Sequence, residues 1–255
     1  SLTWPQALMI LFHFLVGLAE VVVVGDVHPS GQSAWGYVTK CRFVVRVLGV
    51  GVVKGGLTAM SQSLGANLPW RGGRYVGLLF KLAGVFSLLT MAGGLLFRRQ
   101  LLELLGVPEA IFPLTLDLWV LFLFIIPSSY ISFATVAIFR SRKNVWIPLA
   151  SAIIVCIVNV FGDLGFGLGM FGLPNLGAEG LIWSSIVSVT AGAVFNVIVL
   201  LRKKIVTRKS FASWRWEKRA FPYILKVALP AGGSQLLWQL GYLMLYLITN
   251  TLPYA

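Results

Sequence analysis

The sequence is poor in acidic residues and in cysteine. Its 255 residues include 8 Asp and Glu against 21 Lys and Arg, and only 2 Cys. Cys41 and Cys156 fall in long apolar segments, so they indicate neither a disulfide framework nor a metal site. HExxH, CxxC, GxSxG and Walker motifs are also absent, and we therefore expect neither an enzyme nor a bound cofactor.

Long hydrophobic segments make up most of the chain. Hydrophobic residues account for 58% of the sequence and charged residues for 11%, which is typical of a membrane protein rather than a soluble domain. A helix of about 20 apolar residues crosses the hydrocarbon layer of a bilayer. The sequence therefore predicts an all-α polytopic membrane protein with seven spans: 3–25, 34–62, 73–97, 111–139, 145–171, 177–201 and 221–250.

The basic residues gather in alternate loops. They lie between spans two and three, four and five, and six and seven: Arg71, Arg74, Arg140, Arg142, Lys143 and the eight basic residues of 202–219. In the opposite loops Arg98 and Arg99 are offset by Glu103 and Glu109. Because cytoplasmic loops carry the excess of Lys and Arg, we expect a multi-pass protein of the cell membrane with a cytoplasmic N-terminus.

A basic segment, residues 202–220, divides the chain. Trp214 and Trp216 lie among its Lys and Arg, and one interpretation of this pattern is a segment that binds RNA or anionic lipid. A cytoplasmic loop resting on lipid headgroups accounts for it better, and we expect no nucleic acid partner. We expect a six-helix lobe over 1–201, a basic linker over 202–220, and over 221–255 the first helix of a second lobe, so that the chain is a fragment.

Asp117 and Glu179 lie near the ends of predicted spans, which leaves two acidic residues well inside them, Glu20 in the first and Asp163 in the fifth. An ionised carboxylate at the bilayer centre costs about 2.5–3.5 kcal/mol on insertion scales, so such residues usually mark an ion or proton path. The alternative is a carboxylate that is neutral or paired with Arg and only fixes helix packing. Asn159 precedes Asp163 by four residues and therefore shares its helical face.

These three side chains suit a coupling ion. An Asn carbonyl oxygen beside a carboxylate suits either Na⁺ or a proton-linked hydrogen bond, and two carboxylates close together in a low-dielectric site hold a proton between them. We predict an ion site for H⁺ or Na⁺ at Glu20, Asn159 and Asp163, with no other metal. The sequence leaves open whether Glu20 and Asp163 meet in space.

The second predicted span carries a basic stripe. At about 100° per residue, Arg42, Arg46 and Lys54 fall within about 120° of one another. Such a stripe is not expected to face lipid. Two interpretations stay open: the stripe provides counter-ions for the two buried acids, or it lines a substrate cavity and contacts an anionic compound.

These segments resemble the multidrug and toxic compound extrusion (MATE) family, within the superfamily that also contains lipid-linked oligosaccharide flippases. The first span resembles the family's Val-Asp-Thr-x-x-x-Gly ending, with Glu20 in place of the usual Asp. GGLTAMSQSLGAN at 55–67, NVFGD at 159–163 and GAEG at 177–180 resemble motifs of the second, fifth and sixth helices. By the same resemblance Ser185 falls at a hydroxyl position of the sixth helix.

The resemblance implies a fold of two six-helix lobes around a central cavity, and export of small organic substrates driven by entry of H⁺ or Na⁺. This chain would hold the first lobe of such a MATE-like transporter and the first helix of the second. Some members place a coupling Glu in the seventh helix, where this chain has Trp238 and Gln239. Coupling would then depend on the polar residues of the first lobe.

The basic stripe departs from the family pattern, because a cavity for cationic drugs is not expected to carry Arg42, Arg46 and Lys54. It motivates a second hypothesis, a flippase for an anionic lipid-linked precursor whose pyrophosphate these three side chains would hold. The sequence thus predicts an ion-coupled transporter in a lipid bilayer and leaves the substrate open.

Overall fold

The computed structural model describes residues 3–27 and 31–251, and within these ranges it contains helices and no strand. The helices are α1 (Thr3–Val27), α2 (Gly31–Gly65), α3 (Pro69–Leu96), α4 (Arg98–Leu104), α5 (Phe112–Leu123), α6 (Ile126–Ser141), α7 (Trp146–Gly162), α8 (Gly177–Arg202) and α9 (Trp214–Thr251). A π-helical turn, η2 (Asp163–Gly167), continues α7. Short turns lie at η1 (Glu109–Ile111), η3 (Met170–Gly172) and η4 (Arg208–Ser210). The all-α prediction is confirmed.

Five of the described helices are long and apolar enough to cross a bilayer: α1, α2, α3, α7 with η2, and α8. The pair α5 and α6 would make a sixth crossing, with a bend of 46° between the two helices. The sequence predicts one span over 111–139, but the structure divides it after Leu123. Pro127 in the first turn of α6 explains the break, because proline has no N–H to donate to the preceding turn.

The last helix begins earlier than the sequence predicts. The predicted linker extends to residue 220, whereas α9 already starts at Trp214, and the backbone N–H of Glu217 donates to the carbonyl oxygen of Ser213 at 3.1 Å. By length and hydropathy α9 is not one of the five crossing helices. The seventh span and the division of the chain at residue 201 remain predictions, and residues 252–255 lie outside the described residues.

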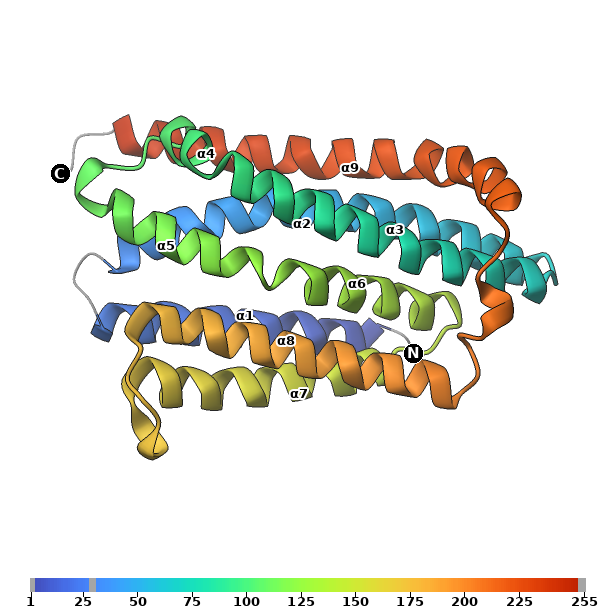
Figure 1. The fold of residues 1–255 in the computed structure, drawn as a ribbon, viewed down its shortest axis with the longest axis horizontal. Helices are drawn as coiled ribbons and strands as arrows, with labels where there is room; N and C mark the ends of the chain where they lie inside the picture. The colour runs from blue at the N-terminus through green and yellow to red at the C-terminus, as the bar shows by residue number, and fades with distance from the viewer. Residues whose placement is uncertain (1–2, 28–30, 252–255) are drawn as a thin grey trace.

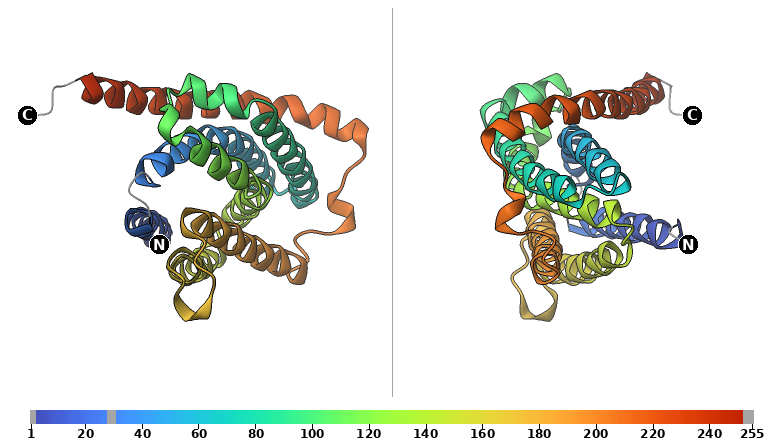
Figure 2. Two further views of the ribbon diagram at one scale, coloured as in Figure 1. Left: turned by 60° about the vertical axis from the view of Figure 1, so that its left-hand side comes forward. Right: turned by 90° about the vertical axis from the view of Figure 1, so that its right-hand side faces the viewer.

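The long helices run side by side, with α6 inside the bundle (Figure 1, Figure 2). α6 packs against α2, α3 and α8, while α7 pairs with α8 and α1 lies against α7. On the other side of the bundle α9 lies along α2. The α2–α3, α6–α7 and α8–α9 connections meet at one end, on the right of Figure 1. We call this the basic end, because Lys and Arg lie in the α6–α7 and α8–α9 connections and, as Arg71 and Arg74, at the start of α3.

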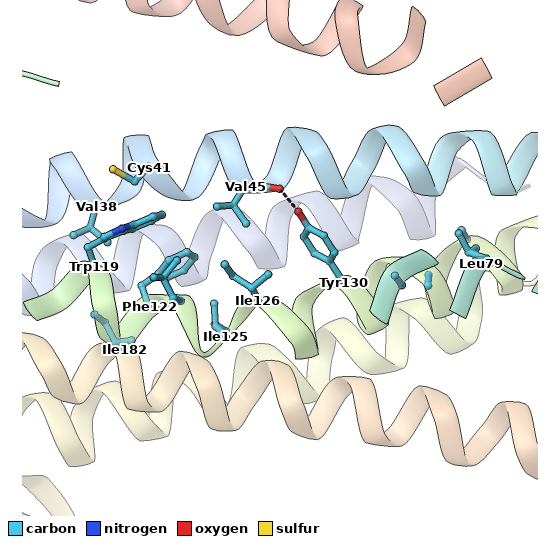
Figure 3. Packing of buried hydrophobic residues seen from close by; sticks show 14 of the residues in the cluster. Val38, Cys41, Val45, Leu79, Trp119, Phe122, Ile125, Ile126, Tyr130 and Ile182 are labelled. Carbon is cyan, nitrogen blue, oxygen red and sulfur yellow. Dashed lines mark hydrogen bonds between the residues drawn. The ribbon is translucent and has the colours of Figure 1, made fainter. Parts of the chain in front are cut away.

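Aromatic side chains of α5 and α6 fill the space beside α2 (Figure 3). Trp119 and Tyr130 are 1% and 2% exposed. The Tyr130 hydroxyl donates to the backbone carbonyl oxygen of Val45 in α2 at 2.8 Å and lies 3.2 Å from Oγ1 of Thr90 in α3. Because a buried hydroxyl without a partner is costly, these bonds fix α6 against both helices and set the position of α2.

The segment after α8 folds back onto α3. Nζ of Lys81 in α3 bonds to Oε1 of Glu217 at 2.6 Å, and the Glu217 side chain is buried. Trp216 packs edge-on against Tyr75, with ring centroids 5.1 Å apart. The start of α9 is therefore anchored to α3 at the basic end of the bundle.

Candidate ion-binding site

Polar residues of three helices meet inside the lobe. Glu20 comes from α1, Asn159 from α7 and Asp163 from the first position of η2, with exposed fractions of 5%, 1% and 1%. α8 adds the buried hydroxyl groups of Ser184 and Ser185. Residues 159 and 163 lie one turn apart, and both bond to serines of α8, the helix that pairs with α7.

Asn159 connects the two helices. Its Nδ2 donates toward Oγ of Ser184 at 3.1 Å and Oγ of Ser185 at 3.3 Å, and Oγ of Ser188 lies at 3.5 Å. The Ser184 hydroxyl lies 2.6 Å from Oδ1 of Asp163 and 2.9 Å from the backbone carbonyl oxygen of Asn159, and either atom can accept its single proton. Small polar groups therefore surround one side of the Asp163 carboxylate.

Glu20 joins this cluster from α1. Its Oε1 accepts a hydrogen bond from Oγ of Ser185 at 2.9 Å, and its Oε2 accepts one from Nη1 of Arg42 in α2 at 3.1 Å. Since Ser185 also lies next to Nδ2 of Asn159, a chain of hydrogen bonds links the two acids. The structure thus brings together Glu20, Asn159, Asp163 and Ser185, four residues that the sequence singled out.

Gly162 permits this close packing of α7 and α8. A Cβ atom built at position 162 would lie 2.8 Å from both Cβ and Oγ of Ser184. Carbon atoms in contact are normally about 3.5–4.0 Å apart. Any larger side chain at this position would push Ser184 away from Asp163.

Two buried oxygen atoms of the cluster have no hydrogen-bond partner among the described residues: Oδ1 of Asn159 and Oδ2 of Asp163. Buried polar atoms of this kind are uncommon and costly. Oxygen is the ligand type that hard cations prefer, and a carboxylate oxygen can also take up a proton. The cluster therefore has the donor atoms for H⁺ or Na⁺.

Sequence reasoning passed over Ser184 and Ser188. A signal was present, because the two residues are four apart in an otherwise apolar helix and therefore share a face. The contact between Arg42 and Glu20 was one of two interpretations left open. The sequence of either helix alone does not predict this contact, because it depends on how α1 and α2 pack.

A cavity of about 340 Å³ lies beside the cluster. Its walls include Glu20, the basic residues Arg42 and Arg46, and aromatic side chains of α5 and α6. Lys54, the third member of the predicted basic stripe, is exposed on α2 but does not line this cavity. The structure therefore places two of the three basic residues at the same cavity.

Known proteins similar to this chain are named as transporters or multidrug resistance proteins. The uncharacterized transporter YisQ of Bacillus subtilis (strain 168) is 23% identical over 249 residues, which cover 96% of this chain and 54% of YisQ. The probable multidrug resistance protein NorM of Burkholderia pseudomallei (strain K96243) is 25% identical over 223 residues, covering 83% of this chain and 45% of NorM. The chain thus spans about half the length of the curated relatives it matches.

Solved structures and a family model also match this chain, and they agree with these relatives. The crystal structure of the MATE transporter VcmN of Vibrio cholerae in the bent form matches with a TM-score of 0.87 at 20% identity, covering 96% of this chain and 55% of VcmN. A family model described as MatE matches residues 5–164, more than half of the chain. As the sequence resemblance predicted, the chain belongs to the MatE family of membrane transporters.

Proposed function

We propose that this chain is the first lobe, with one further helix, of an exporter that moves small organic compounds out of the cell in exchange for H⁺ or Na⁺. One observation carries the proposal. Two buried oxygens, Oδ1 of Asn159 and Oδ2 of Asp163, have no hydrogen-bond partner among the described residues, and their side chains are linked by hydrogen bonds through Ser184 and Ser185 to Glu20. Relatives named as multidrug resistance proteins support the export of small organic compounds.

The coupling step would act on helix packing. A proton or Na⁺ at Asp163 neutralises a charge that is costly inside the membrane. The hydroxyl of Ser184 then loses a charged acceptor, and the contacts of α7 and α8 that depend on it rearrange, including the bond from the Asn159 amide to Ser184. Exchange of ion for substrate requires that the two ligands favour different access states of the protein.

The arrangement in the membrane is part of the proposal. The basic end of the bundle would face the cytoplasm, together with the start of α1 and the linker before α9. The second lobe would face the cavity beside Arg46 and close it from the other side. A flippase for a lipid-linked pyrophosphate is not favoured, because Lys54 does not line the cavity and so the three basic residues do not converge on one phosphate group.

The test uses the full-length protein in liposomes with imposed H⁺ or Na⁺ gradients. The probes are rhodamine 123, an organic cation, and fluorescein, an organic anion. We expect gradient-driven movement of at least one probe. Asp163→Asn should lower it by about tenfold or more, which corresponds to about 1.4 kcal/mol, because asparagine provides no negative charge for the coupling ion. Asp117→Asn is the matched control, because Asp117 is an exposed acid of α5 outside the cluster. Gradient-driven transport that survives in Asp163→Asn would refute the proposal.

A further inference from the structure

The cavity beside the ion site carries an excess of positive charge. With histidine counted as neutral, three of its wall residues carry a formal charge, namely Glu20, Arg42 and Arg46. Arg42 and Glu20 form an ion pair at 3.1 Å and largely neutralise each other. Arg46 forms no ion pair with any residue that the structure describes, and its side chain is exposed at the cavity. The net formal charge that this chain presents at the cavity is therefore positive.

The position of Arg46 makes this charge available to a ligand. It lies four residues after Arg42 on α2, so both side chains project from one face toward the same cavity. The Arg42 guanidinium is held by Glu20 and lies 5.1 Å from the ring centre of Phe122. Arg46 lies one turn deeper along the helix, and its guanidinium donors have no acceptor among the described side chains.

The remaining walls suit an apolar body. Phe122, Tyr130 and Phe133 contribute aromatic surface, and Ser129 and Ser132 contribute hydroxyl groups. A volume of about 340 Å³ falls in the usual range for small-molecule sites of about 300–1,000 Å³. The site can thus take a compound with an aromatic body and one anionic group.

We propose that this cavity selects organic anions, which bind through a carboxylate or phosphate placed on the guanidinium of Arg46. Guanidinium groups bind such anions with two parallel hydrogen bonds. An anionic ligand supplies the counter-ion that Arg46 lacks among the described residues, whereas an organic cation would be repelled by it. This inference rests on the proposed function and names the class of its substrate.

The proposal is tested by equilibrium binding to the purified full-length protein, without any gradient. Rhodamine 123 and fluorescein share the xanthene ring and differ in charge, so their fluorescence anisotropy compares the two charge classes on one body. We expect fluorescein to bind at least about tenfold more tightly than rhodamine 123 to the unaltered protein. Equal or tighter binding of rhodamine 123, or no saturable binding of fluorescein, would overturn the inference.

Variants then locate the selectivity. Arg46→Met should weaken fluorescein binding by about 10- to 100-fold, as expected for loss of a charge-assisted hydrogen bond, and Arg46→Glu should favour rhodamine 123. Lys54→Met is the matched control, since it removes a basic residue of the same helix that does not line the cavity. Equal effects of Arg46→Met and Lys54→Met would contradict the proposal. Such a result would be expected if a carboxylate of the second lobe neutralises Arg46.

The two experiments fail independently. Anion selectivity is measured at equilibrium, so its absence would leave the result for Asp163→Asn in gradient-driven transport unaffected. Conversely, transport that persists in Asp163→Asn would refute ion coupling at this acid without changing the relative affinities of the two dyes. The comparison of the two dyes uses the unaltered protein, so its result does not depend on whether any variant folds.

Discussion

At the scale of single residues, the two buried acids differ in how many of their oxygens are satisfied. Both oxygens of Glu20 accept hydrogen bonds, one from Ser185 and one from the cation Arg42. Asp163 has one oxygen bonded to a neutral hydroxyl and one without a partner among the described residues. Glu20 is therefore already compensated, and Asp163 is the acid whose coordination a coupling ion would complete.

The ion pair between Glu20 and Arg42 predicts that the effects of mutating its two members on stability are not additive. Glu20→Gln leaves Arg42 without its counter-ion, and Arg42→Gln leaves the buried acid uncompensated. We expect each change to lower the free energy of unfolding by about 2–3 kcal/mol, less than for a fully buried pair because the Arg42 side chain is 29% exposed. In the double variant the free energy of unfolding should fall by clearly less than the sum of the two single decreases.

The measurement is the thermal unfolding midpoint of the full-length protein and its three variants in detergent. Arg46→Gln is a suitable control, because Arg46 forms no ion pair with a described residue and its loss should cost little stability. Strict additivity of the two single changes would show that the pair contributes nothing to stability.

At the scale of secondary structure, two local features set the site. The break between Leu123 and Ile126, just before Pro127, bends α5 relative to α6 by 46°. Aromatic residues on both sides of the break line the cavity. On the other side of the site, α7 ends in the π-helical turn η2, which begins at Asp163. π-helical turns occur often at functional sites, and here the turn carries the acid that faces α8.

Packing of α7 against α8 leads to a second prediction. Gly162→Ala would place Cβ 2.8 Å from Ser184, and overpacking of this kind costs about 1–3 kcal/mol. We expect a lower thermal midpoint and weaker gradient-driven transport, because Ser184 moves away from Asp163. Gly84→Ala in α3 is the control, as its Cβ meets nothing within 4 Å.

Thermal unfolding and transport should therefore separate these two glycine variants. An alanine at position 84 replaces glycine in a helix interior and should be neutral or slightly stabilising. If Gly162→Ala behaved in the same way in both measurements, the close approach of α7 and α8 would have no role in holding the site.

At the scale of the whole molecule, the basic loops gather at one end of the bundle (Figure 1). The anchor between Lys81 and Glu217 places the linker at that end as well. Positive charge in short loops retains them in the cytoplasm, so the tertiary arrangement supports the orientation proposed from the sequence. The opposite end carries the turn at η3 between α7 and α8.

This orientation predicts which positions are reachable from outside an intact cell. In the full-length protein with Cys41 and Cys156 replaced by alanine, Pro174→Cys should react with a membrane-impermeant maleimide and Lys203→Cys should not. Both positions are exposed, and they lie at opposite ends of α8. After permeabilisation both should react. Labelling of Lys203→Cys alone in intact cells would reverse the proposed orientation.

The sequence by itself determined the class of the fold and the candidate residues. Hydropathy and helical spacing are local properties, so they predicted the helical membrane bundle and the shared face of Asn159 and Asp163. Pro127 was visible too, but the bend that it makes was missed because apolar composition continues across it. The division into lobe and linker remains a prediction, and α9 extends into the second half of the predicted linker.

Only the tertiary structure decided which candidates meet. The bond between Glu20 and Ser185 joins residues 165 positions apart, and helical spacing gives the face of each helix without saying which helix lies opposite. For the same reason the pairing of Arg42 with Glu20 and the exclusion of Lys54 from the cavity could not be read from their shared stripe. These contacts depend on how α1, α2, α7 and α8 pack, which is set by the whole core rather than by any one segment.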